Sequence, residues 1–153
     1  MGIKITNMTE VVTMFQLTEK RVTEEARSVL RRYAEKVKND AVAFAPVDEH
    51  NLEKAIKVLP SQGNQYTLRM TIAVGGVVGG RNVDEYAAIV HEYQWSKRGP
   101  YTRLKGPKAG PRYLKRAVEA NEKGLKADLA KAMQKGIDTA IRQSGVNKRA
   151  RRR

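Results

Sequence analysis

The chain has 153 residues, a length that suits one domain and leaves no room for a second sizeable one. It has no cysteine, which excludes disulfides, thiolate zinc sites and thiol catalysis and favours a reducing compartment. The net charge is +14, no stretch approaches the roughly 18 apolar residues of a membrane span, and the polar N-terminus is unlike a signal peptide, so we expect acidic partners and no membrane.

A long helix is predicted from Thr18 to Phe44, because apolar residues recur along it at steps of three and four. Thr18 suits the N-cap, and Pro46 prevents continuation, since its ring disfavours helical geometry at the residue before it. Residues 1–17 have no firm period and are expected to form an N-terminal arm or a weak strand. The core-facing stripe of the helix comprises Val22, Ala26, Val29, Leu30, Tyr33, Val37, Ala41 and Phe44.

A short helix is expected after the proline. Asp48 can cap it, and the helix would bury Leu52, Ala55 and Ile56, which are apolar within a polar run. This segment is therefore predicted to anchor the turn after Pro46 in the core.

The small sheet is expected to follow. Residues 57–60 suit a first strand, with a turn at 61–64. Residues 66–74 alternate apolar and polar side chains almost strictly, which makes them the clearest strand in the chain. The glycine-rich run 75–80 is predicted to be a flexible loop or a hairpin tip.

The second half of the chain begins with an ambiguous segment, 84–95, which we expect to be a short helical turn that runs into a strand. Residues 96–111 contain three Gly and three Pro, a composition that predicts an irregular loop, and long loops of this kind are usually functional. A second long helix is predicted from Pro111 to Gln143, weakened at Gly124 and Gly136. Residues 18–145 would thus form a single α+β domain, followed by a basic C-terminal tail at 146–153.

The positive charge is concentrated in two segments. Residues 97–116 carry eight Lys and Arg and 142–153 carry six, with no Asp or Glu in either, while the rest of the chain is neutral. In the first segment the cations are interleaved with aromatic residues, which is typical of a surface that binds a polyanion or an acidic protein. The predicted contacts are Lys97, Arg98, Arg103, Lys105, Lys108, Arg112, Lys148, Arg149, Arg151, Arg152 and Arg153.

No catalytic, metal or cofactor site is predicted. The run from Gly75 to Asn82 approaches a P-loop, but Arg81 and Asn82 replace the Lys and the Ser or Thr that nucleotide binding requires. His50 and His91 lack the spacing of a zinc site, and the neighbouring carboxylate pairs point apart on any regular element. The sequence therefore indicates a protein that is not an enzyme.

Three blocks of the sequence resemble the tail-completion or neck proteins of bacteriophages, which stand at the head–tail junction of the virion. In that family the blocks usually read Pro-Val-Asp-Thr-Gly-x-Leu-x-x-Ser-Ile, Tyr-Ala-x-x-Val-Glu-x-Gly-Thr and Pro-x-Phe-Leu-x-x-Ala. Glu49 and His50 replace the usual Thr-Gly of the first block. The blocks here are Pro46-Val47-Asp48-x-x-x-Leu52-x-x-x-Ile56, Tyr86-Ala87-x-x-Val90-x-Glu92 and Gly110-Pro111-Arg112-Tyr113-Leu114-x-x-Ala117.

The resemblance implies an α+β fold in which a small antiparallel sheet is flanked by long N-terminal and C-terminal helices. It also implies a homo-oligomeric ring, often of six subunits, that joins the DNA-filled head to the tail. The implied partners are the head connector or adaptor, the tail terminator or tube proteins and the packaged DNA, and the implied location is the virion, assembled in the host cytoplasm. The alternative from composition alone is a basic nucleic-acid-binding protein that acts as a monomer or dimer.

Overall fold

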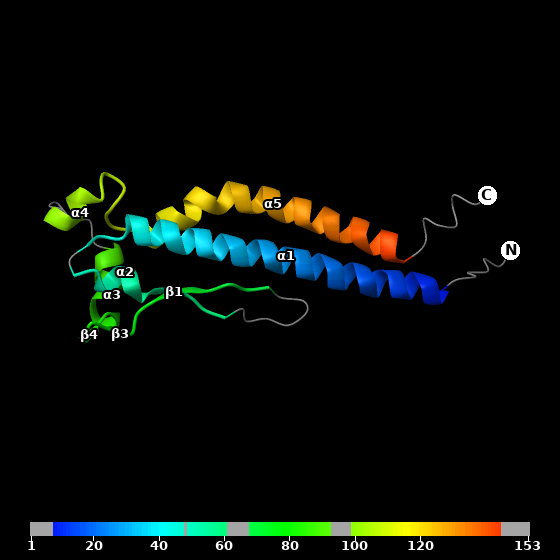
Figure 1. The fold of residues 1–153 in the computed structure, drawn as a ribbon, viewed down its shortest axis with the longest axis horizontal. Coiled ribbons are helices and arrows are strands. Elements are labelled where there is room, and N and C mark those ends of the chain that lie inside the picture. The colour runs from blue at the N-terminus through cyan, green and yellow to red at the C-terminus, as the bar shows by residue number, and fades with distance from the viewer. Residues whose placement is uncertain (1–7, 48, 61–67, 93–98, 145–153) are drawn as a thin grey trace. The chain divides into compact units, whose positions relative to one another are not determined.

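The computed structural model describes residues 8–47, 49–60, 68–92 and 99–144 (Figure 1). Its fold is α+β, as predicted, with a long helix near each end of the chain and a small antiparallel component between them. None of the described helices has an apolar stretch long enough to cross a membrane. The helices are α1 (Met8–Phe44), α2 (Asn51–Ala55), α3 (Asp84–Glu92), α4 (Pro100–Leu104) and α5 (Tyr113–Gln143), and the strands are β1 (Ile56–Val58), β2 (Ile72–Val74), β3 (Val77–Val78) and β4 (Arg81–Asn82).

Helix α1 ends where the sequence predicts and begins ten residues earlier. The last helical residue is Phe44, and the amide of Ala45 still donates to the carbonyl of Ala41 before Pro46 diverts the chain. Because α1 begins at Met8, Thr18 lies inside the helix, and the expectation of an arm or weak strand over residues 8–17 is wrong. This stretch contains neither Gly nor Pro, and each residue added to an existing helix gains one hydrogen bond, so the helix extends towards the N-terminus without an apolar period.

The predicted stripe of α1 faces the core over much of its length. Ala26, Val29, Tyr33, Val37 and Ala41 are all buried. The expected burial after Pro46 is also confirmed, with Leu52 5 % exposed at α2 and Ile56 2 % exposed at the start of β1. His50 is the N-cap residue of α2, in a left-handed conformation with φ of 62° and no side-chain cap bond, whereas the predicted cap Asp48 lies outside the described residues.

The antiparallel component consists of two two-stranded sheets. Strands β1 and β2 pair with Ile56 opposite Val74 and Val58 opposite Ile72, and the amide of Leu59 donates to the carbonyl of Thr71 just beyond the strands. Of the described part of the predicted strand, 68–74, only 72–74 is regular strand, and residues 66–67 and the turn predicted at 61–64 lie outside the described residues.

The glycine-rich run is a hairpin tip, as predicted. Strands β3 and β4 are antiparallel neighbours joined by Gly79 and Gly80, whose φ angles are 59° and 77°. Two successive positive φ angles suit the tight turn that matches strand twist, and glycine reaches them without strain.

Two segments contain more helix than the sequence predicts. Helix α3 is nine residues long and continues to Glu92, with Tyr86, Ala87 and Val90 at helical spacing. The strand expected after the helical turn would fall on residues 93–95, which lie outside the described residues. Helix α4 interrupts the predicted loop 96–111, with Pro100 at its first position, where a fixed φ favours helix and no amide donor is needed.

The chain forms two compact units. One comprises Arg31–Leu125 and holds both sheets, α2, α3, α4 and the main hydrophobic cluster. The other comprises Met1–Leu30 and Lys126–Arg153, and its described part is a pair of helical segments from α1 and α5. In that pair, Arg21 donates to the side-chain oxygen of Gln143 at 3.0 Å and Lys135 pairs with Glu25 at 2.9 Å.

Candidate functional site

The three sequence blocks meet in the hydrophobic cluster of the unit Arg31–Leu125. The first block contributes Leu52 and Ile56, the second Ala87, and the third Tyr113 and Ala117, all of them buried. Segments that lie more than sixty residues apart in the chain therefore form one core, on which the surrounding surface is built.

Tyr113 is central to this core. Its side chain is 1 % exposed, and the ring of His91 meets it edge to face at a centroid distance of 5.1 Å. Burial, followed by the nearby charge of ionised Tyr86, raises the pKa of Tyr113 from 10.0 to about 12. The folded chain therefore holds the phenol proton more tightly than the unfolded chain does.

This pKa predicts a loss of stability at alkaline pH. Stability from the raised pKa is fully present below pH 10 and is lost as pH rises through about 12, because the unfolded chain ionises its phenol first. We expect Tyr113→Phe, which has no phenol, to lose less stability than the wild type between these values. Chemical denaturation at a series of pH values measures the difference, and parallel curves for the two proteins would contradict the assignment.

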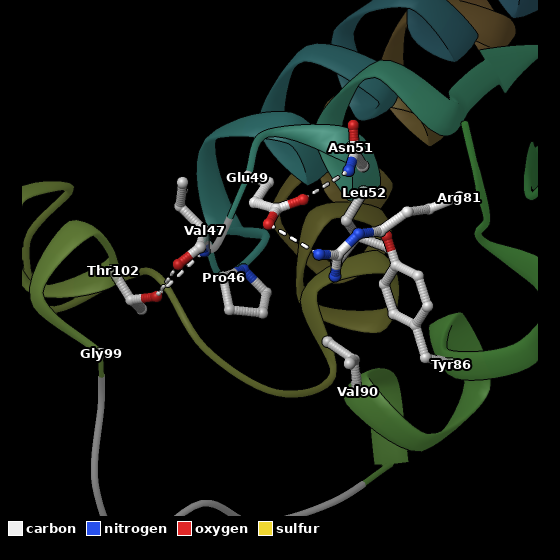
Figure 2. Close-up of a pocket in the computed structure, with 10 residues that line it drawn as sticks. All are labelled: Pro46, Val47, Glu49, Asn51, Leu52, Arg81, Tyr86, Val90, Gly99 and Thr102. Atoms are coloured by element: carbon white, nitrogen blue, oxygen red, sulfur yellow. Dashed lines mark hydrogen bonds and ion pairs between the residues drawn. The ribbon is translucent and has the colours of Figure 1, made fainter. Parts of the chain in front are cut away.

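A pocket of about 300 Å³ opens beside this core (Figure 2). Near its centre lie Pro46, Val47, Glu49, Asn51 and Leu52. Helix α4 contributes Thr102 on one side, and α3 contributes Tyr86 and Val90 on the other. At its rim Arg81 donates to a carboxylate oxygen of Glu49 at 2.8 Å. The lining is mostly apolar with a charged rim, a chemistry that suits a side chain of a protein partner more than a polyanion.

Helix α4 is fastened to the rest of this unit by two inward side chains. The hydroxyl of Thr102 accepts from the amide of Val47 at 2.9 Å and donates to its carbonyl at 3.1 Å. The ammonium of Lys105 donates to the carbonyls of Val42 and Ala45 and pairs with the carboxylate of Glu53. Lys105 thereby supplies a positive charge at the C-terminus of α1, which has no basic residue in its own last turn.

The eleven predicted binding cations do not form one described site. Lys97, Arg98 and the five cations of 148–153 lie outside the described residues. Of the remaining four, Arg103, Lys108 and Arg112 are exposed, whereas Lys105 is engaged in the internal contacts above. Arg112 has φ of 54°, and its amide donates to the carbonyl of His91, so its backbone joins the start of α5 to the end of α3.

The outward faces of α3 and α4 were not predicted from the sequence as candidate surfaces. Large apolar side chains are exposed there, with Leu104 at 83 %, Ile89 at 61 % and Tyr101 at 56 %. A helical projection of 84–92 places Asp84, Glu85, Ala88, Ile89 and Glu92 on one side, a pattern readable once the segment is taken as helix throughout. Within the described ranges, no group of three or more His, Asp or Glu side chains is arranged to hold a metal ion.

Comparison of the chain with protein-family models, with curated proteins and with solved structures gave no match.

Proposed function

We propose that this protein is a non-enzymatic structural component of a bacteriophage virion, a tail-completion or neck protein that assembles as a homo-oligomeric ring at the head–tail junction. In this role it would contact a head connector or adaptor on one side and tail terminator or tube proteins on the other. The proposal rests on the sequence resemblance together with one structural observation.

That observation is the meeting of all three blocks in one core. Leu52, Ala87 and Tyr113 come from different blocks and are buried in the same hydrophobic cluster. Blocks that define one fold are required to meet in this way, and the buried side chains are consistent with that requirement. The exposed apolar side chains of α3 and α4 add support, because a ring needs two different complementary surfaces on each subunit.

The alternative, a basic monomer or dimer that binds nucleic acid, is favoured by the net charge of +14. Among the described residues, however, Lys105 is turned inward, which leaves Arg103, Lys108 and Arg112 as the exposed members of the predicted set. We therefore rank the assembly role first.

Particle size and salt dependence separate the two roles. We expect the purified chain to form rings of uniform size in negative-stain images and to bind free duplex DNA weakly. If the tail met phosphates, each neutralised contact would add about 0.9 to the slope of log affinity against log salt. Removing residues 148–153, which carry five cations, would then flatten that slope by about four to five units.

In the assembly role the same truncation leaves DNA binding almost unchanged and prevents heads from joining tails. The truncated chain should keep the melting temperature of the full chain, which serves as the control for folding. A small species that binds duplex tightly, with a slope that flattens on truncation while particles assemble normally, would instead establish the nucleic-acid role.

A further inference from the structure

The outward face of α4 is an exposed apolar surface on a fixed support. Thr102 and Lys105, three residues apart, point inward and hold the helix through the hydrogen bonds described above. Tyr101 and Leu104, also three residues apart, are 56 % and 83 % exposed. Arg103 and Lys108 of the same segment are also exposed, and the whole segment 97–116 contains no acidic residue. This surface, defined by Tyr101, Arg103, Leu104 and Lys108, is called the basic face.

The outward face of α3 has the same construction with the opposite charge. Ala87 is buried, whereas Ile89 is 61 % exposed. Glu85 and Glu92 lie on the same side, and α3 contains no Lys or Arg. The local contact of Glu85 is with the neutral amide of Asn82, and that of Glu92 is with His91. This surface, defined by Glu85, Ile89 and Glu92, is called the acidic face.

The two faces belong to different helices around one pocket. Thr102 of α4 and Tyr86 and Val90 of α3 line this pocket from opposite sides (Figure 2), whereas the exposed side chains Leu104 and Ile89 do not line it. Each face exposes apolar area in the described structure, and the charges around the two apolar centres are complementary, so a second molecule can cover both.

We propose that the basic face of one copy docks on the acidic face of the next copy. Leu104 and Tyr101 pack against Ile89, while Arg103 and Lys108 lie near Glu85 and Glu92 of the neighbour. Because the two faces are different surfaces of the subunit, the contact is head-to-tail and can repeat around a ring. The inference rests on the proposed ring and names the surfaces that build it.

Cysteine cross-linking tests the contact directly, since the chain has no cysteine of its own. Chains carrying Ile89→Cys are mixed with chains carrying Leu104→Cys and treated with a short bifunctional thiol reagent. We expect a cross-linked dimer in the mixture and little in either variant alone. Val118→Cys, another exposed apolar position, is the control and should not cross-link to Leu104→Cys. Self-linking of one variant, or equal linking with the control, would overturn the proposal.

Charge reversal gives an independent test. Arg103→Glu with Lys108→Glu makes both faces of a chain acidic, and Glu85→Lys with Glu92→Lys makes both basic. We expect each double variant to self-associate at least about tenfold more weakly, because like charges then face each other. An equimolar mixture should recover association, since each acidic chain can alternate with a basic one, and light scattering measures all three samples. The melting temperature of each variant serves as the control for folding. The difference in self-association between the variants and the wild type should become smaller at high ionic strength, because salt screens charges at the surface.

The outcomes also separate this inference from the proposed function. Rings that persist with both double variants, with no recovery effect in the mixture, overturn the named surfaces and leave the ring intact. A wild-type chain that stays monomeric at every accessible concentration overturns the surfaces and the ring together.

Discussion

Replacing Leu52 by alanine is expected to lower the free energy of unfolding by about 2–5 kcal/mol, one of the two largest effects we predict. Leu52 is 5 % exposed and belongs to the hydrophobic cluster that the three sequence blocks share. Truncation removes apolar contacts and leaves a cavity, and α2 has little freedom to collapse into it because β1 follows directly at Ile56. Urea denaturation followed by circular dichroism measures the change.

The matched control for this prediction is Leu104→Ala. The same side chain is removed there, but Leu104 is 83 % exposed in the single chain, so its loss should change the stability of the monomeric chain, measured at high dilution, by less than about 0.5 kcal/mol. Equal effects at the two positions would show that the turn after Pro46 is not anchored in the core.

Replacing Gly136 by alanine is expected to destabilise the helical pair of the unit formed by Met1–Leu30 and Lys126–Arg153. A methyl group at Gly136 would lie 2.7 Å from the Cα and 2.8 Å from the amide nitrogen of Val22, closer than atoms can approach. Both are backbone atoms that no rotamer change can move, so the helices must separate. Overpacking of this kind typically costs about 1–3 kcal/mol, which exceeds the roughly 1 kcal/mol that alanine gains over glycine in a helix.

Gly124→Ala is the matched control in the same helix. Its added methyl group would meet the hydroxyl of Tyr33, the far end of a side chain, at 2.7 Å, and a small tilt of that side chain can relieve the contact. We expect a smaller loss, or a gain, in melting temperature. A stabilising Gly136→Ala would mean that the helical pair is more widely spaced than the structure has it.

The two glycines illustrate how far helix propensity alone reaches. Glycine has a low helix propensity, so the sequence predicts only that both glycines weaken α5. The close contact with Val22 gives Gly136 a packing reason that depends on a residue more than one hundred positions away, and no local pattern contains that information.

Lys105 shows that the sequence does not determine which cations are exposed. In the sequence it is one of eight cations in an acid-free segment, equivalent to its neighbours. In the fold it binds carbonyls at the end of α1 and the carboxylate of Glu53, while Lys108, three residues later, is exposed. Only the path of the backbone between Thr102 and Gly110 decides which cations face solvent.

The sequence by itself determined the features that depend on local order. Apolar periodicity defined most of both long helices, and Pro46 ended the first of them. The glycine-rich run 75–80 indicated a loop or a hairpin tip, and the apolar positions after Pro46 predicted buried Leu52 and Ile56. Steric and hydrogen-bonding preferences of neighbouring residues are sufficient for these. The tertiary structure alone decided that α3 is helical as far as Glu92 and that α4 is a helix, that the three blocks share one core, and that α3 and α4 both line one pocket. Each of these depends on contacts between segments far apart in the chain, whose free energy is gained only when the whole unit folds.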